Sequence, residues 1–169
     1  STLFLETELS LLGQQVRTGL PIGIALYLCF SGLDWLVAPE LFKKFLLLRL
    51  VAIIFPVAMI PLSKTGFAKE RVRVLTLITF LIGATSMIAM CVFLGGFASN
   101  YFVGLILMMF FVGLFLPWGL VNSFIFLVLT NFGYFGVCIY KNGGFENSEM
   151  PIAFMLGSAV LTHLAASMM

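Results

Sequence analysis

Charged residues are scarce in this sequence of 169 residues. Nine lysines and arginines and seven acidic residues make up only 9% of it, whereas a water-soluble domain carries about 25%. Hydrophobic residues make up 62%, including 19 phenylalanines, and the mean hydropathy is +1.15. These values exclude an ordinary soluble domain, and the few scattered basic residues exclude a nucleic-acid partner. The surroundings of this chain must be lipid.

Residues for metal or catalytic chemistry are also few. His163 is the only histidine, and the three cysteines, Cys29, Cys91 and Cys138, lie in apolar stretches without the spacing of a metal site. The sequence has no His-Glu-x-x-His, no Gly-x-Ser-x-Gly and no phosphate-binding loop. We therefore expect free thiols that pack as small hydrophobic groups, no cofactor and no metal. A lipid-modifying enzyme is accordingly the weakest of the candidate functions.

Long apolar runs separated by turn-forming residues predict an all-α polytopic membrane bundle with about six transmembrane helices. The expected spans are Thr18 to Val37, Leu41 to Leu62, Val74 to Gly95, Tyr101 to Leu116, Val121 to Tyr140, and Pro151 to Met169. Residues 1–17 alternate apolar and polar side chains, which is typical of an amphipathic helix at the membrane interface. An extension of the first span is the alternative. We thus expect an interfacial segment over residues 1–17 and a six-helix domain over residues 18–169.

Basic residues near the ends of spans indicate the orientation, because they are retained on the cytoplasmic side. The larger group lies between the second and third expected spans and ahead of the first: Lys64, Lys69, Arg71, Arg73 and Arg17. The smaller group falls on the opposite side: Lys43, Lys44 and Lys141. This distribution predicts that both termini are cytoplasmic.

Arg49 is surrounded by apolar residues inside the second expected span. It lies about 12 Å below the membrane surface if the span begins at Leu41, and a charge at that depth is costly unless it is paired or hydrated. Asp34, near the end of the first span, is the nearest acid in the sequence. The structural interpretation is an Asp34–Arg49 ion pair that joins the first two spans. The functional interpretation is an anchor for an anionic or polar ligand headgroup, and snorkelling to the surface is a third possibility.

Four other polar residues are candidate ligand contacts: Asn100, Tyr101, Asn131 and His163. Hydrogen bonds between helices and anchoring at the interface explain the first three as well as ligand binding does. His163 is either a neutral packing residue or a group that binds a ligand or senses protons. The phenylalanines and methionines of the fourth and fifth spans either face lipid or line an apolar pocket. Arg49, Asn100 and Tyr101 together predict a pocket in the outer half of the membrane, with walls of phenylalanine and methionine.

Several short stretches point to one class of receptor. They are Gln14-Gln15-Val16-Arg17 ahead of the first span, Leu33-Asp34 at its end, Leu48-Arg49-Leu50 in the second, and Asn100-Tyr101-Phe102-Val103-Gly104-Leu105 opening the fourth, which runs on to Leu116-Pro117-Trp118. With six spans and two cytoplasmic ends, this pattern resembles the N-terminal sensor regions of bacterial adenylyl or guanylyl cyclases and of quorum-sensing histidine kinases of the cholera-autoinducer type. The resemblance implies the bacterial inner membrane, a homodimer, and an output domain of unknown chemistry beyond Met169.

We therefore expect a membrane-embedded sensor or anchor domain. It would bind a small apolar or amphipathic ligand, or a lipid, among its helices and signal through the last helix. A small transporter or channel is the alternative, with a hydrated path lined by Arg49, Asn100, Asn131 and His163. The sequence shows no internal repeat in support of that alternative.

Labelling of single cysteines in intact cells tests the predicted topology. After replacement of the native cysteines by serine, Glu149→Cys should react with a membrane-impermeant maleimide. Thr65→Cys should react only after permeabilisation, because it lies in the predicted cytoplasmic loop. Reaction of Thr65→Cys from outside would overturn the predicted orientation.

Overall fold

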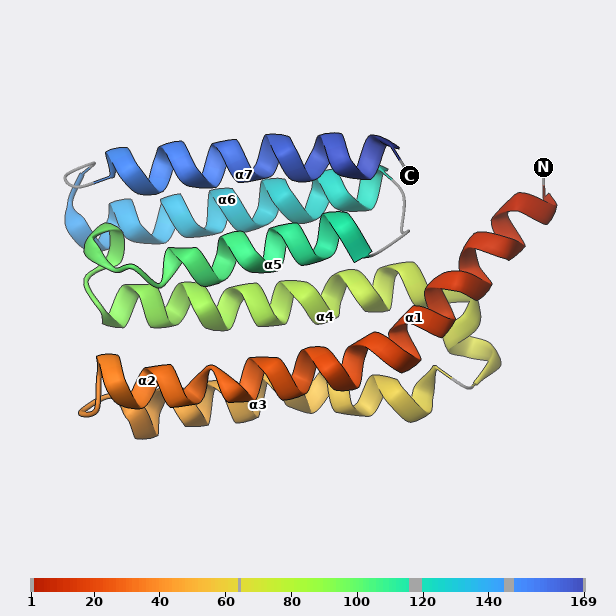
Figure 1. The fold of residues 1–169 in the computed structure, drawn as a ribbon, viewed down its shortest axis with the longest axis horizontal. Coiled ribbons are helices and arrows are strands. Elements are labelled where there is room, and N and C mark those ends of the chain that lie inside the picture. The colour runs from red at the N-terminus through yellow and green to blue at the C-terminus, as the bar shows by residue number, and fades with distance from the viewer. Residues whose placement is uncertain (1, 64, 116–119, 145–147, 169) are drawn as a thin grey trace. The chain divides into compact units, whose positions relative to one another are not determined.

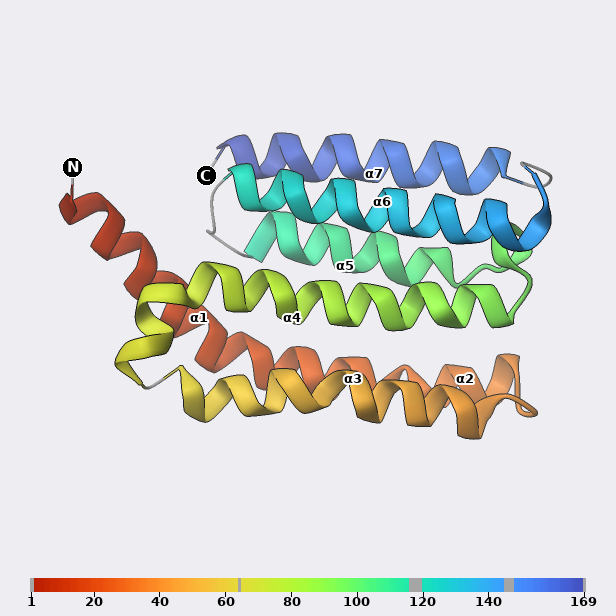
Figure 2. The same ribbon diagram turned by 180° about the vertical axis from the view of Figure 1, so that it is seen from behind.

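The structure is a computed structural model of the chain, drawn in Figure 1 and from behind in Figure 2. It describes residues 2–63, 65–115, 120–144 and 148–168. Lys64, the stretch Leu116-Pro117-Trp118 and Met169 lie outside these residues, so the statements about them stay predictions. The described residues form seven α-helices and one 3₁₀ helix, which confirms the all-α fold class.

The helices follow the apolar runs of the sequence. They are α1 (Thr2–Cys29), α2 (Ser31–Val37), α3 (Phe42–Leu62), α4 (Gly66–Phe93), the 3₁₀ helix η1 (Gly96–Ala98), α5 (Phe102–Phe115), α6 (Leu120–Asn142) and α7 (Glu149–Met168). The helix α1 runs without interruption through the amphipathic segment into the first expected span. The placement of that segment at the interface stays a prediction.

Four segments of the described residues are long and apolar enough to cross a membrane: Val16–Val37, Phe42–Leu62, Arg71–Phe93 and Leu120–Asn142. Two shorter apolar helical segments, Phe102–Gly113 and Glu149–Leu164, fall below that length. Large apolar side chains are exposed on these helices, such as Leu36 and Phe132, each at 75%, as expected where a helix faces lipid. The described residues therefore contain four helical segments that could span a membrane. The count of six spans stays a prediction.

The chain divides into two compact units, Ser1–Gly83 and Ala84–Met169, here called the N-terminal and C-terminal units. The helix α4 contributes residues to both. In the N-terminal unit, α3 returns along α1 and α2 after a short turn. Arg17 Nη2 donates a hydrogen bond of 3.0 Å to the carbonyl of Ser63, which ties α1 to the C-terminal end of α3.

In the C-terminal unit, α5, α6 and α7 lie side by side (Figure 1 and Figure 2), and α5 packs most extensively against α7. The two helices approach each other closely at Gly113, where a Cβ atom would clash with the Thr162 side chain and lie 2.9 Å from the Thr162 carbonyl oxygen. Farther along, the Ser158 hydroxyl lies 3.6 Å from Met109 Sδ. Small residues permit such close approach between membrane helices, so α5 and α7 form one tightly packed pair.

The substitution Gly113→Ala tests this close contact. It should lower the free energy of unfolding by about 1–3 kcal/mol, because the added methyl group forces α5 away from α7. The measurement is unfolding in mixed detergent micelles, with Gly157→Ala as the control, since nothing lies within 4 Å of a Cβ atom built at Gly157. Equal stabilities of the two variants would show that the helices do not touch at Gly113.

Candidate functional site

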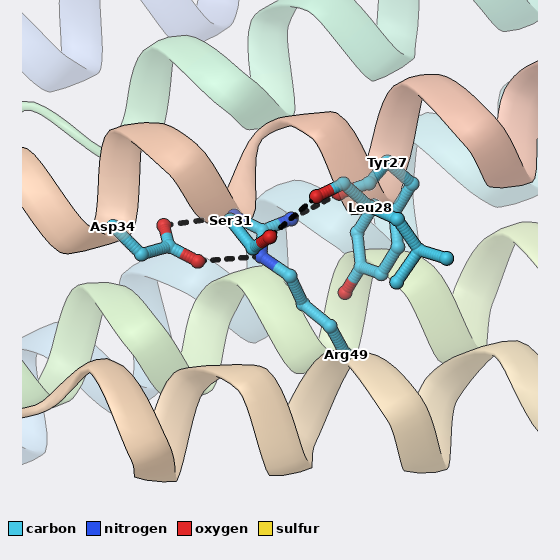
Figure 3. Close-up of polar contacts among 5 residues, drawn as sticks. All are labelled: Tyr27, Leu28, Ser31, Asp34 and Arg49. Atoms are coloured by element: carbon cyan, nitrogen blue, oxygen red, sulfur yellow. Dashed lines mark hydrogen bonds and ion pairs between the residues drawn. The ribbon is translucent and has the colours of Figure 1, made fainter.

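Arg49 and Asp34 form a buried ion pair within the N-terminal unit (Figure 3). Arg49 Nε lies 2.7 Å from Asp34 Oδ2, and Arg49 Nη2 donates to Asp34 Oδ1 at 3.0 Å. The two residues are 2% and 0% exposed. The two parallel hydrogen bonds give the planar, bidentate arrangement that makes an arginine–carboxylate pair strong.

The same guanidinium also bonds to the backbone where the helix of the first candidate span, Val16–Val37, is interrupted. The helix α1 ends at Cys29 and α2 begins at Ser31, and the last carbonyls of a helix have no partner within it. Arg49 Nη1 donates to the Tyr27 carbonyl at 3.0 Å, and the Ser31 hydroxyl donates to the Leu28 carbonyl at 2.6 Å. Figure 3 shows both contacts beside the ion pair. Side chains thus replace the helical hydrogen bonds that the interruption removes.

Local electrostatics favour this arrangement. Arg49 approaches the C-terminal end of α1, where the helix dipole attracts a cation, and Asp34 lies in the first turn of α2, where the dipole favours an anion. The guanidinium carbon lies 4.7 Å from the centre of the Tyr27 ring, within the range of a cation–π contact. The three guanidinium nitrogens of Arg49 each have a partner, so the positive charge is bonded to groups of the protein itself.

The other four candidate ligand residues belong to the C-terminal unit and lie at three levels along it. Asn100 and Tyr101 are in the turn before α5, near the end of α6, and the Tyr101 amide donates to Ser99 Oγ at 3.2 Å. Asn131 is midway along α6. His163 is on α7 beside Phe124, with the ring centres 5.9 Å apart. Phe124 and Asn131 are two turns of α6 apart, about 10 Å, so these four residues do not converge on one point.

The buried face of α6 carries a line of polar side chains. Four of them are at most 8% exposed: Ser123, Thr130, Asn131 and Tyr134. Among the described residues, Ser123 Oγ, Thr130 Oγ1 and Asn131 Oδ1 have no hydrogen-bond partner, and neither have Thr162 Oγ1 and His163 Nδ1 on α7. The Tyr134 hydroxyl lies beside Cys138, which is its hydrogen-bond partner. An unpaired polar atom in an apolar interior costs free energy. We call the four α6 residues the polar stripe.

Sequence reasoning missed part of this arrangement. It named Asn131 as a candidate ligand residue but not Ser123 or Thr130, although spacings of three, four and seven residues along α6 place these residues and Tyr134 on one face. It also missed Tyr27 and Gly113, because neither the interruption near Phe30 nor the close contact between α5 and α7 has a sequence signal. The pairing of Asp34 and Arg49 does have one, namely the cost of an isolated charge in lipid.

Comparison with protein families identifies the chain. The sequence model of the MASE8 family matches residues 32–169, a region that includes Asp34, Arg49 and the polar stripe. The chain belongs to the MASE8 family. MASE8 domains are membrane-associated sensor domains, so the role of the chain is that of a membrane sensor. Comparisons with curated proteins and with solved structures found no match.

A double-mutant cycle tests the ion pair of this MASE8 domain. Arg49→Leu should lower the free energy of unfolding by about 3–5 kcal/mol, because Asp34 is left buried without its guanidinium partner. Asp34→Leu should be similarly harmful, and the double variant should recover part of the loss. Unfolding in mixed micelles provides the measurement, and Lys43→Leu, an exposed cation on the same helix, is the control. Additive effects of the two single substitutions would mean that the side chains do not interact.

Proposed function

We propose that this MASE8 domain is the sensor region of a dimeric signalling receptor, a histidine kinase or nucleotide cyclase of the bacterial inner membrane. It binds a small apolar or amphipathic ligand among the helices of its C-terminal unit, with both termini in the cytoplasm. The observation that carries this proposal is the polar stripe, because unpaired buried oxygens on α6 favour a state in which another molecule pairs with them.

The link to the last helix comes from the contact between α5 and α7. Gly113 and Thr162 touch through backbone and side-chain atoms, so a displacement of α5 carries α7 with it. A ligand shifts a two-state equilibrium by the difference between its affinities for the two states. Contacts with the polar stripe that exist in only one arrangement of the helices would supply that difference.

Arg49 has a structural role in this proposal. Its three guanidinium nitrogens bond to Asp34 and to the Tyr27 carbonyl, so the ion pair fixes the turn between the first two spans. This also weakens the transporter alternative, because Arg49, the cation inside the span Phe42–Leu62, is occupied within its own unit.

A chimera tests whether the signal leaves through α7. Residues 1–168 are joined to the catalytic domain of a dimeric adenylyl cyclase, and one to four alanines are inserted at the junction. Each inserted residue rotates the output domain by about 100° relative to α7. Cyclic AMP production in cells should therefore fall with one or two insertions and recover with three or four. Production that is independent of the number of inserted residues would refute signalling through α7.

A further inference from the structure

We infer that the N-terminal unit binds an anionic phospholipid at the end where α3 turns into α4. The headgroup phosphate contacts Arg17, Arg71 and Arg73, and an acyl chain lies deeper in the membrane, along the exposed apolar face of α4. This inference goes beyond the proposed function and does not depend on it, because such binding requires neither an output domain nor a signal.

Positive charge collects at this end of the unit. Residues 63–73 contain four basic residues and one acid, Glu70. With Arg17, five basic residues and one acidic residue give a formal charge of +4. The nearest acid before Arg17 in the sequence is Glu8, which lies nine residues earlier on α1 and hence about 14 Å along its axis. At physiological ionic strength charges are screened over about 8 Å, so Glu8 does little to neutralise the cluster.

The structure joins the two parts of this cluster. Arg17 Nη2 donates to the carbonyl of Ser63, which lies three residues before Gly66, the first residue of α4. Arg71 and Arg73 lie about 8 and 11 Å along α4 from that start. Arg17 and Arg71 are exposed, and Arg73 is partly buried. A guanidinium has five N–H donors, so the bond to Ser63 orients Arg17 and leaves it able to bind a phosphate as well.

The three arginines lie at the depth of the lipid headgroups. Candidate spans begin at Val16 and at Arg71, so each arginine is among the first three residues of a span. By helical rise, each is within about 3 Å of the start of its span. The polar headgroups lie directly outside the hydrocarbon core that a span crosses, which places a lipid phosphate within reach of these side chains.

Arginine is the residue type best suited to this contact, because its planar guanidinium forms two parallel hydrogen bonds with a phosphate group. The fourth arginine of the chain, Arg49, is bonded to Asp34 instead. The basic residues expected on the opposite side of the membrane are all lysines: Lys43, Lys44 and Lys141. Retention of positive charge on one side explains a basic cluster there, but it does not by itself favour arginine over lysine.

The face of α4 that carries Arg71 continues into the membrane as an apolar surface. Val74 and Ile78 follow Arg71 at spacings of three and seven residues, which place all three on one side of the helix. Their exposed fractions are 55% and 38%. A free phosphate ion gains nothing from such a surface, whereas a phospholipid covers it with an acyl chain. We therefore assign the site to a lipid and not to a soluble anion.

Quenching of tryptophan by brominated lipids tests this site. The full chain with Trp35→Phe and Trp118→Phe receives one new tryptophan, Val74→Trp. It is placed in phosphatidylcholine nanodiscs with increasing fractions of brominated phosphatidylglycerol. Because brominated chains quench a tryptophan that they touch, the curve gives the affinity of phosphatidylglycerol relative to phosphatidylcholine beside α4. That ratio should be about five, the factor expected for one basic residue beside an anionic lipid surface.

Matched variants separate contact with the arginines from a general effect of membrane charge. Arg71→Gln should lower the ratio below about two, and Arg71→Lys, which retains the charge, should keep it above that value. Lys43→Gln/Lys44→Gln, at the other end of α3, should leave it unchanged. A tryptophan placed in the middle of α6 by Phe132→Trp, at a residue that is 75% exposed, should report a ratio of about one.

The inference is overturned by a ratio of about one at Val74→Trp, by equal ratios at Val74→Trp and Phe132→Trp, or by an unchanged ratio in Arg71→Gln. A comparison of salts distinguishes a lipid from a soluble anion. Sodium phosphate should reduce the ratio no more than sodium chloride of the same ionic strength does. A larger reduction by phosphate would assign the arginines to a soluble anion and refute the lipid site.

Discussion

In a bilayer, a polar group cannot obtain its hydrogen bond from solvent, so each must find a partner inside the protein or remain unpaired at a cost in free energy. The N-terminal unit meets this constraint at its most demanding point. The guanidinium of Arg49 pairs with Asp34 and with a carbonyl released by the break between α1 and α2. A break in a transmembrane helix is tolerated here because a side chain of a neighbouring helix satisfies the backbone.

The C-terminal unit leaves the same constraint partly unmet. Two unpaired polar side chains in the middle of α6, Thr130 and Asn131, each carry a desolvation cost of about 1–3 kcal/mol. Their sum is comparable with the few kcal/mol that separate the two states of a typical molecular switch. Among the described residues, the unpaired atoms of α6 and α7 therefore distinguish the C-terminal unit from the paired charges at the centre of the N-terminal unit.

The fold class and the positions of the helices could be predicted from the sequence because apolar runs of known length dominate it. The pairing of Asp34 with Arg49 follows from the cost of a lone charge in lipid, and the structure places the two side chains in contact. The predicted pocket grouped Arg49 with Asn100 and Tyr101, because all three were expected near one membrane surface. Depth in the membrane does not indicate which unit a residue belongs to, and the structure places Arg49 in one unit and the other two residues in the other.

The contact between Gly113 and Thr162 also has a consequence for how α5 and α7 would move together in the proposed sensor. Phenylalanine and methionine side chains absorb a small displacement by changing rotamer, so packing made of them is mechanically soft. Gly113 has no side chain to rotate, and its main chain rests on the side chain and carbonyl of Thr162. This point of contact is stiff. In the proposed sensor, a small displacement of α5 would therefore reach α7 with little loss of amplitude, because no side chain at Gly113 can change rotamer to absorb it.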